Sequence, residues 1–590
     1  MQGLIIQNIY STMQATFTIY QENPVSHYIN IKLTLQNVKD KKIILKQPRW
    51  RPGRYELGNF AKNVQNFFAF DSKGNKLLVL KPNTHTWEIL NENIDNTISI
   101  QYNYYANEYN AGACFANENI LYFNPVHLLM QPHPSENSKI QYTVKLNVPD
   151  SYKIVTSLKV KNKTIVSNDF DELVDSPIVA TKYVKTFSYK IDELKFFVHT
   201  IDLHQNDLDE KKLKNDFYLF TQQILRFWGT APFKEYHFII HLLPYNFYHG
   251  VEHLKNTVIC LGPANQVMNK LYDELLGVSS HELFHSWNIK TIRPAQMQKY
   301  DYYSENYSEL GFVYEGFTTY YGDKLLWQSN VFSDSQFFRC ISERLNKHYL
   351  NFGKHSQSLL NSSIDTWVDG YANFAPHKKV SIYDEGCIFA MTMDLYLILK
   401  TNKHRTLRDV CLKLYDAQVN KNQPYTFEFI MNSILETTKD KKERDIILET
   451  LLFPNDYLPL FEKVSSPFGF YIEYEESENW WERYFGFKIS EQNNSYIVNS
   501  ILPDSPAYSA LSLNDEIIGI NNIPAKHLFS NKNKLPDNSI QLTINRFHQI
   551  QTVNLKLNNK KTFFQKLHLK VKDKLSSKEK DLFTHYKKLF

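Results

Sequence analysis

Residues His281-Glu282-Leu283-Phe284-His285 place two histidines four positions apart, with a glutamate directly after the first one. On a helix, side chains at positions i and i+4 lie on one face, so both imidazoles can reach the same Zn²⁺ ion. Glu282 lies about 100° around such a helix, close enough to act on a water molecule at the metal without being a ligand. The pattern predicts a helical metal site in which Glu282 is the acid-base group.

A third ligand is expected, because a catalytic zinc ion is held by three protein side chains and keeps one position open. Glu315 follows the second histidine by 30 residues and opens the segment Glu315-Gly316-Phe317-Thr318-Thr319-Tyr320-Tyr321, which has the pattern of a second helix. The cysteines lie too far from the histidine pair to be ligands. We therefore expect His281, His285 and Glu315 to bind one Zn²⁺ per chain, although the same ligands also accept other divalent metals.

Hydrophobic patterning divides the chain into β-rich and helical parts. Residues 1–180 alternate apolar and polar side chains, as in Tyr28–Leu35, and predict an N-terminal β domain resembling a sandwich. Residues 181–460 are mainly helical in pattern, and short strands return between 466 and 558. We expect a multidomain α+β protein that ends in a tail over residues 559–590.

The net charge of +5 is concentrated in this tail. Residues 560–590 hold ten lysines and three acidic residues, a net charge of +7, so the remaining chain carries −2. Ser576 and Glu579 have the spacing of a capping box and predict one short amphipathic helix with a solvated basic face. A nearly neutral body gives no reason to expect a nucleic acid or a membrane surface as partner.

Cysteine content and apolar run lengths bear on the compartment. The five cysteines are an odd number without CxxC spacing, which is typical of free thiols in a reducing environment. No apolar run approaches the roughly 18 residues that a membrane helix needs. No Lys or Arg precedes Lys32, so the basic segment of a secretory signal is missing. We expect a cytoplasmic protein.

Further motifs accompany the histidine pair. Trp287-Asn288-Ile289-Lys290 and Ile292-Arg293-Pro294 follow it, and Pro48-Arg49-Trp50-Arg51-Pro52-Gly53-Arg54-Tyr55 with Asn59–Val64 lies in the N-terminal part. Together with Glu315-Gly316-Phe317, these motifs resemble the glycyl aminopeptidase family, gluzincin metallopeptidases that carry a PDZ domain near the C-terminus. The resemblance spans nearly the whole chain. It implies a thermolysin-like catalytic domain, one zinc ion and removal of small N-terminal residues such as Gly or Ala from peptides.

The resemblance also implies roles for residues outside the ligand set. Gly250-Val251-Glu252-His253 is similar to the family's GxEH segment, where a carboxylate beside the metal pins the substrate's α-ammonium by charge-assisted hydrogen bonds. Glu252 is thus the expected anchor, with Gly250 lining the substrate site. Tyr383, in Tyr383-Asp384-Glu385-Gly386, resembles the tyrosine that stabilises the oxyanion in related aminopeptidases.

Four positions leave the site's details open. His249 stands where the family has glycine, beside the expected substrate strand. Tyr320 and Tyr321 are alternatives to Tyr383 as the oxyanion donor. Asp394, alone on an otherwise apolar helix, could accept a hydrogen bond from a ligand histidine.

The region from 466 to 558 looks like a PDZ domain. Tyr484-Phe485-Gly486-Phe487 resembles the loop that captures a C-terminal carboxylate, and Ser505-Pro506-Ala507 follows at the expected place. Ala510 and Asn514 stand where glycines are usual. We expect this domain either to bind a C-terminal peptide or to act within the chain.

Two other functions are compatible with these motifs. The same zinc centre could belong to an endopeptidase, which needs no free N-terminus. The chain could also be a catalytically inactive scaffold that acts through its PDZ domain. The sequence does not fix the oligomeric state.

Overall fold

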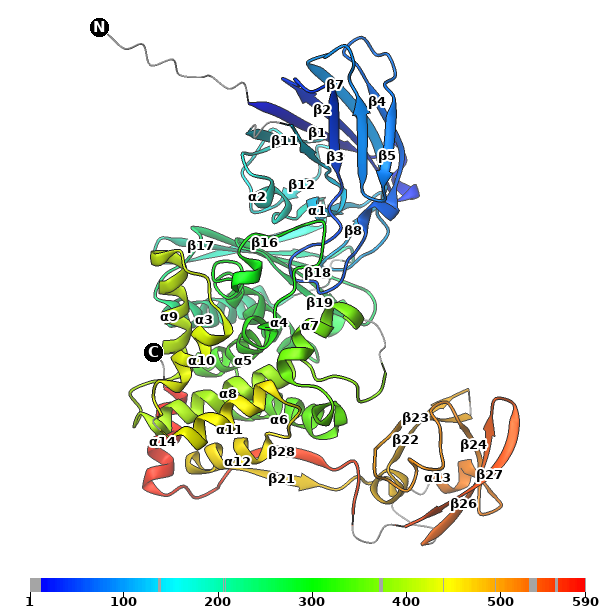
Figure 1. The fold of residues 1–590 in the computed structure, drawn as a ribbon, viewed down its shortest axis with the longest axis vertical. Helices are drawn as coiled ribbons and strands as arrows, with labels where there is room; N and C mark the ends of the chain where they lie inside the picture. The colour runs from blue at the N-terminus through cyan, green and yellow to red at the C-terminus, as the bar shows by residue number, and fades with distance from the viewer. Residues whose placement is uncertain are drawn as a thin grey trace.

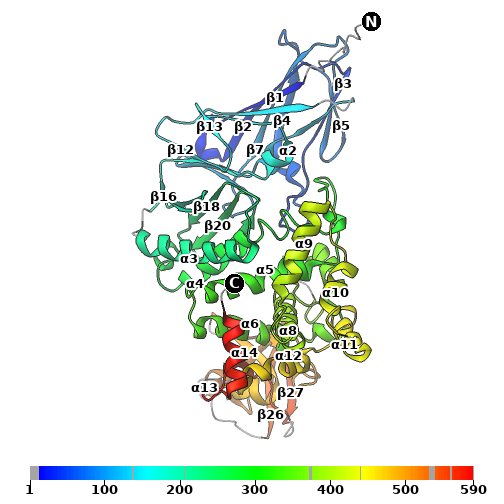
Figure 2. The ribbon, with the colours of Figure 1, turned by 90° about the vertical axis from the view of Figure 1, so that its left-hand side faces the viewer.

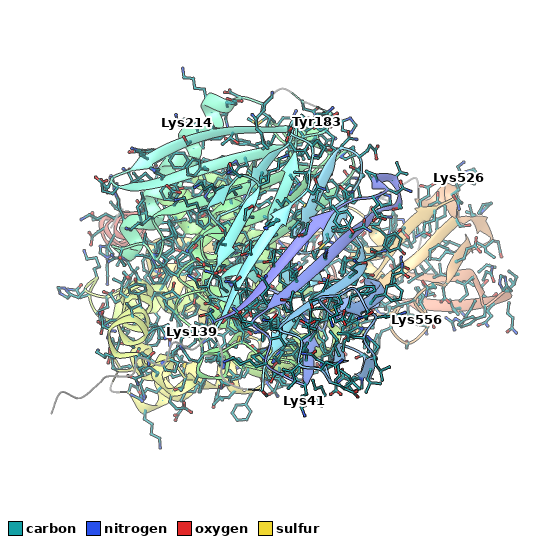
Figure 3. The ribbon with its side chains drawn as sticks, turned by 90° about the horizontal axis from the view of Figure 1, so that it is seen from above. Lys41, Lys139, Tyr183, Lys214, Lys526 and Lys556 are labelled. Carbon is teal, nitrogen blue, oxygen red and sulfur yellow. The ribbon has the colours of Figure 1, made fainter. Side chains whose placement is uncertain are left out.

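The computed structural model describes residues 12–135, 139–204, 206, 208–370, 375–438, 440–493, 495–529, 538–557 and 561–588. A β-rich N-terminal part, a mainly helical middle part and a C-terminal PDZ region follow one another (Figure 1). Seen from above, the PDZ region with Lys526 and Lys556 lies to one side of the rest (Figure 3). The predicted fold class, a multidomain α+β protein, is confirmed.

Three sheets build the N-terminal part. Their strands are β1 (Met13–Tyr20), β2 (Tyr28–Gln36), β3 (Lys42–Lys46), β4 (Val64–Phe70), β5 (Val79–Asn83), β6 (Thr86–Leu90), β7 (Thr97–Tyr105), β8 (Cys114–Ala116), β9 (Ile120–Phe123), β10 (Gln131–His133), β11 (Ile140–Leu146), β12 (Lys153–Val155), β13 (Val160–Lys161), β14 (Thr164–Ser167) and β15 (Ile178–Thr181). The short helices α1 (Pro125–Leu128) and α2 (Phe170–Val174) connect them.

The alternating pattern of the N-terminal strands gives this part its sandwich character. The largest sheet has the order β13-β14-β11-β1-β2-β7-β4, and a second sheet has the order β10-β3-β6-β5. Phe17 and Leu33 of the first sheet share one buried core with Leu45 and Trp87 of the second. Strands such as β1, β2, β3 and β6 thus bury one face between the two sheets.

The middle part contains a sheet of order β16-β17-β18-β20-β19, hereafter the central sheet, whose last strand lies at the edge. Its strands are β16 (Val184–Ile191), β17 (Leu194–Ile201), β18 (Glu235–Leu242), β19 (Phe247–Glu252) and β20 (Asn256–Gly262). The helices are α3 (Glu210–Trp228), α4 (Tyr272–Phe284), α5 (Thr318–Gln328), α6 (Asp334–Leu350), α7 (Leu359–Asp369), α8 (Asp384–Lys400), α9 (Leu407–Lys421), α10 (Phe427–Leu435), α11 (Lys441–Leu452) and α12 (Leu458–Ser465). The N-terminal sheets, the central sheet and these helices succeed one another along the long axis (Figure 2).

The PDZ region has its own core. It consists of β22 (Phe487–Gln492), β23 (Ser495–Ile501), β24 (Glu516–Ile520), β25 (Ile523–Pro524), α13 (Ala525–Phe529), β26 (Ser539–Arg546) and β27 (Gln549–Lys556). Trp480, Trp481 and Phe529 pack together inside it. Among the helices of the described ranges, none is long and apolar enough to cross a membrane.

The chain returns from the PDZ region to the helical part. β28 (Lys566–Val571) pairs antiparallel with β21 (Phe470–Glu475), and α14 (Ser577–Lys587) follows. α14 starts with the predicted capping box of Ser576 and Glu579, and it lies against the helical part, away from the PDZ region (Figure 1). The predicted boundary between PDZ domain and tail, at 558–559, lies outside the described residues.

A buried polar cluster fastens α14. The Tyr586 hydroxyl lies 2.9 Å from the Tyr320 hydroxyl on α5, and the Lys324 ammonium lies 4.2 Å from the centre of the Tyr586 ring. Asp394 on α8 accepts hydrogen bonds from Lys324 and Tyr320, both at 2.5 Å. One face of the predicted amphipathic helix, the face that carries Tyr586, is therefore packed into the helical core.

We predict that Tyr586→Ala destabilises the helical part. It removes a ring that is 1% exposed, and truncation of a buried aromatic side chain costs about 3–5 kcal/mol. Thermal unfolding followed by circular dichroism should show a lower midpoint for the transition that includes this part. Lys580→Ala, an exposed position on the same helix, should leave the midpoint unchanged. Equal midpoints for the wild type and Tyr586→Ala would contradict the packing described here.

Candidate metal centre

The two histidines of the motif lie at the C-terminal end of α4. Their Nε2 atoms approach each other to 3.0 Å, and the ring planes make an angle of 83°. His281 belongs to α4 itself, and His285 is the residue that ends it. Both rings thus point their Nε2 atoms at one place, as the i, i+4 spacing predicts.

Asn288 fixes the orientation of His285. The Nδ1–H of His285 donates to the main-chain oxygen of Asn288 at 2.7 Å, so Nε2 is the ring nitrogen that remains available for a metal ion. The Asn288 side chain donates to the main-chain oxygen of Val313 at 2.9 Å and to Thr318 Oγ1 at 3.1 Å. One residue of the Trp-Asn-Ile-Lys motif therefore connects the end of α4 to the segment that carries Glu315.

Glu315 lies in a π-helical turn, η5 (Phe312–Phe317), directly before α5. Its Oε2 is 3.3 Å from His285 Nε2 and 3.6 Å from His281 Nε2. Its other oxygen, Oε1, accepts a hydrogen bond from the hydroxyl of Tyr55. One donor atom from each of His281, His285 and Glu315 lies within 4.8 Å of the others. The three predicted ligands are brought together.

The donor atoms fit a divalent cation. Oε2 of Glu315 is buried and receives no hydrogen bond. Burial alone would raise the pKa of the Glu315 carboxyl, but the two histidines hold it at about 2, so the group is ionised. Burial lowers the pKa of His285, yet Glu315, Glu252 and Glu282 outweigh it and raise the value to about 9. The excess negative charge thus demands a proton or a metal ion, and two imidazole nitrogens with one carboxylate oxygen suit Zn²⁺.

Gly250 allows the edge strand β19 to pass close to α4. A Cβ atom at this position would overlap Glu282 Oε1 and Val278 Cγ2. Glu282 is buried beside the metal ligands, and burial raises the pKa of its carboxyl well above the usual value. Its Oε2 receives no hydrogen bond. The strand and the acid-base candidate are therefore in direct contact only because residue 250 is glycine.

Glu252 is the last residue of β19. It is buried, and it lines the same cavity as the three candidate metal ligands. The residue after it, His253, donates through Nδ1 to Asp175 at 3.0 Å, and Lys290 forms an ion pair with Asp175 at 2.7 Å. Lys290 is thus a structural ion-pair partner of the N-terminal part. This contact holds the end of β19 between the N-terminal part and the segment that follows α4.

Tyr383 directly precedes α8, and its ring centre lies 6.5 Å from that of His281. Gly386, three residues later, packs against Gly316, so that a Cβ on either one would overlap the other's main chain. This close approach explains why both the ligand segment and the tyrosine segment carry glycine. It brings the start of α8 to the metal centre.

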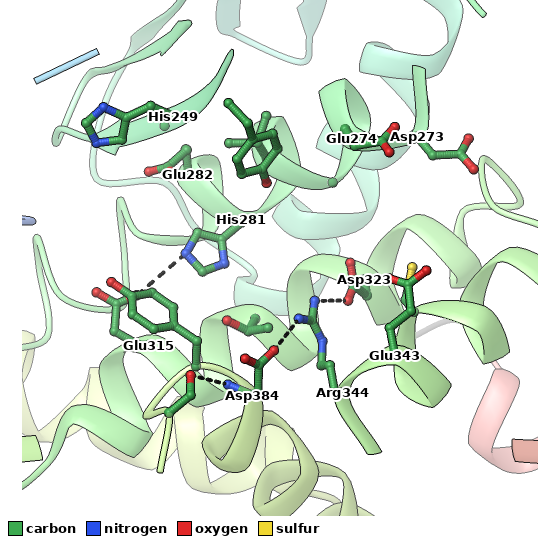
Figure 4. A pocket seen from close by; sticks show the side chains of 18 of the residues that line it. His249, Asp273, Glu274, His281, Glu282, Glu315, Asp323, Glu343, Arg344 and Asp384 are labelled. Carbon is green, nitrogen blue, oxygen red and sulfur yellow. Dashed lines mark hydrogen bonds and ion pairs between the residues drawn. The ribbon is translucent and has the colours of Figure 1, made fainter. Parts of the chain in front are cut away.

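An ion-pair network holds α8 at this place. Arg344 of α6 pairs with Asp384 at 3.2 Å and with Asp323 of α5 at 2.6 Å (Figure 4). Lys347 also pairs with Asp384, at 3.1 Å. α8, which Tyr383 directly precedes, is thereby linked to α5, the helix that follows Glu315.

All seven predicted site residues line one cavity of about 980 Å³. They are His281, Glu282, His285, Glu315, Glu252, Gly250 and Tyr383. Beyond the metal centre, charged side chains of α4 and α6, including Asp273, Glu274 and Glu343, form its walls (Figure 4). His249 lies on the strand side, and burial lowers its pKa to about 3, so its ring is neutral.

Two alternatives from the sequence do not reach the site. Asp394 binds Lys324, Tyr320 and the main-chain nitrogen of Leu407, so the expectation that it could support a ligand histidine is wrong. Tyr320 and Tyr321 are fully buried in the helical core and are not among the cavity's lining residues.

Sequence reasoning missed Tyr55 and Gly53. Tyr55 binds Glu315, and Gly53 lies against Glu252. Both belong to the Pro48–Tyr55 motif, in which the sequence alone assigns no role to any single residue. The signal was present, because a motif rich in Arg, Pro and Gly in a loop suggests a special main-chain path. The contact partners, however, lie far away in the sequence.

Two family models and a domain model match the chain. The N-terminal domain of peptidase family M61 matches residues 16–182, the M61 glycyl aminopeptidase model matches residues 274–389, and a PDZ domain model matches residues 478–545. A search of the curated proteins gave no match.

One solved structure is similar in fold over nearly the whole chain, and another is a weaker match. An aminopeptidase N family protein from Idiomarina loihiensis is 21% identical, with a TM-score of 0.86 over 97% of this chain and 99% of its own. An M1 zinc metallopeptidase from Deinococcus radiodurans is 12% identical, with a TM-score of 0.45 over 75% of this chain and 94% of its own. Nearly the whole chain therefore has the fold of the Idiomarina loihiensis protein.

The range that matches the glycyl aminopeptidase model includes His281, His285, Glu315 and Tyr383. The range that matches the N-terminal model includes the loop with Tyr55. Because both its N-terminal and its catalytic parts match, the chain belongs to the M61 glycyl aminopeptidase family.

Proposed function

We propose that this protein is a zinc-dependent aminopeptidase that removes small N-terminal residues from peptides. The observation that carries the proposal is the convergence of His281, His285 and Glu315, with donor atoms within 4.8 Å of one another, in the cavity that also contains Glu252. Family membership supports a peptidase. The preference for Gly or Ala rests on the family alone.

Zinc, when bound by these three residues, supplies Lewis-acid chemistry by activating water and polarising a carbonyl group. Glu282 takes a proton from the attacking water and delivers it to the leaving amine. Its burial and raised pKa favour proton uptake at neutral pH. Tyr383 donates a hydrogen bond to the oxyanion as it forms.

The edge strand supports an exopeptidase. No described strand pairs with the outer side of β19, so an extended peptide can pair with it. Glu252, at the C-terminal end of β19, can bind the α-ammonium of a peptide that runs antiparallel to this strand. Gly53 lies directly against Glu252, which leaves little room for residues that precede a substrate's first one.

For the PDZ region we propose a role within the chain. The main-chain nitrogen of Phe563, on the return segment to β28, donates to the Arg483 oxygen at 2.9 Å. Phe563 and Phe564 pack with Leu502 of the PDZ region and with Leu350 of the helical part. These contacts lie beside Tyr484–Phe487, the segment that resembles a carboxylate-binding loop, and they favour a role within the chain over capture of a C-terminal peptide.

We also propose a location in a reducing compartment, in keeping with the five unpaired cysteines.

We predict that Glu282→Gln abolishes most turnover while zinc remains bound. Loss of a general base lowers kcat by about 100- to 10,000-fold, and Glu282 is not among the expected ligands. Peptide hydrolysis and metal analysis of the purified chain check both parts. Glu210→Gln, an exposed carboxylate on α3, should behave as wild type. Undiminished turnover in Glu282→Gln would discard the mechanism.

Metal content separates the enzyme from an inactive scaffold. The wild-type chain should contain about one zinc ion per chain, as for a site with three protein ligands. Glu315→Ala should lose it, because it removes the ligand that carries the negative charge. A wild-type chain without metal, and without activity after zinc addition, would favour the scaffold.

We predict that a peptide with a free N-terminus is cleaved and its N-acetylated form is not. Acetylation removes the charge that Glu252 binds, and a charge-assisted hydrogen bond contributes about 1.5–3 kcal/mol. Glu252→Gln should therefore raise KM for the free peptide by about 10-fold or more. Equal cleavage of the free and acetylated peptides would instead identify an endopeptidase.

A further inference from the structure

The loop Pro48–Tyr55 leaves the N-terminal sandwich and reaches the metal centre. It follows β3, and the main-chain nitrogens of Arg49 and Trp50 donate to the Tyr302 oxygen at 2.8 and 3.1 Å. The Trp50 indole donates to the Arg54 oxygen and closes the loop on itself. The loop is therefore fastened both to the segment after α4 and internally before it reaches the ligands.

Tyr55 ends this loop in a fixed position. Its side chain is buried, with 3% of its surface exposed. Its ring stacks on Tyr314 at 5.7 Å between centres and meets Trp367 edge-on at 6.0 Å. Tyr314 is the neighbour of Glu315 in the same π-helical turn. The phenol is thus held by one ring on the ligand segment itself and by a second ring on α7.

The Tyr55 hydroxyl distinguishes the two oxygens of Glu315. It donates to Oε1, whereas Oε2 faces the two histidines. We propose that Tyr55 positions Glu315 for the metal, so that the N-terminal part of the chain completes the catalytic centre. This inference rests on the proposed zinc function and assigns Tyr55 as a positioning residue, because it acts through the ligand.

The physical role follows from carboxylate geometry. A carboxylate with both oxygens unpaired can rotate or bind a metal through either oxygen, and a buried unpaired oxygen is costly. A hydrogen bond to Oε1 satisfies that oxygen and fixes the rotation of the group. A phenol carries a proton at neutral pH, so the Tyr55 hydroxyl can act as the donor to Oε1.

The same loop contacts the amine anchor. Gly53 has a φ of +78°, and a Cβ atom there would overlap the Glu252 carboxylate. Only glycine therefore allows the loop to lie against Glu252 without displacing it. Through Gly53 and Tyr55, one loop of the N-terminal part sets the positions of two carboxylates that belong to the middle part.

The test is the zinc affinity of the full chain carrying Tyr55→Phe. This variant keeps the ring and its stacking but removes the hydroxyl. Loss of a hydrogen bond to a metal ligand typically weakens metal binding by about 10- to 100-fold. Competition with a chromogenic zinc chelator measures this affinity without any need for enzyme activity.

Tyr189→Phe is the matched control. Tyr189 is also a buried tyrosine, and its hydroxyl lies 2.9 Å from Thr221 Oγ1, in the contact between β16 and α3. The control should bind zinc as tightly as wild type. Thermal unfolding of both variants should show intact chains, because each loses only one hydroxyl.

Gly53→Ala tests the second contact of the loop. Its zinc affinity should stay near that of the wild type, whereas its KM for a peptide with a free N-terminus should rise by about 10-fold, as for loss of a charge-assisted hydrogen bond.

The outcomes separate this inference from the proposed function. Zinc affinity of Tyr55→Phe within twofold of the wild type would overturn the role of Tyr55. An equal loss in Tyr189→Phe would also overturn it, because the effect would not be specific. A wild-type chain that binds no zinc would overturn the proposed function and, with it, this inference.

Discussion

Three side chains whose donor atoms face one another, two of them buried, are the constraint on which the rest of this structure depends. His281, His285 and Glu315 converge with no hydrogen donor on the Glu315 oxygen between them. Such a cluster is unfavourable in a low-dielectric interior unless a cation or a proton balances it. Asn288 and Tyr55 hold the ligands from outside, and both are bound to the ligands directly. The centre is therefore built to bind positive charge before any substrate arrives.

A second constraint is the close approach of main-chain segments to their neighbours at the site, which glycine makes possible. The chain has 18 glycines, and several lie around this centre. Gly250 lets β19 meet Glu282, Gly53 lets the N-terminal loop meet Glu252, and Gly316 packs against Gly386. Each would overlap a neighbour if it carried a Cβ atom. These glycines lie where strands, helices and loops come into direct contact at the site.

Local patterns predicted the parts of the site that depend on local geometry. The i, i+4 spacing fixed His281 and His285 on one helix face, and the short segment that opens with Glu315 was a sufficient signal for the third ligand. Tyr383 was found only through the resemblance, because nothing in its neighbourhood distinguishes it from 37 other tyrosines. Contacts across long sequence distances were not predictable. Tyr55 meets Glu315 across 260 residues, and Tyr586 reaches Tyr320 across 266.

The position of the metal tests the account most directly. Anomalous X-ray scattering at the zinc edge, from crystals of the full chain, locates the ion independently of activity. The account predicts one peak per chain, about 2.0–2.2 Å from His281 Nε2, His285 Nε2 and an oxygen of Glu315. A zinc-containing chain whose peak lies elsewhere, or in which Glu315 does not reach the ion, would contradict it.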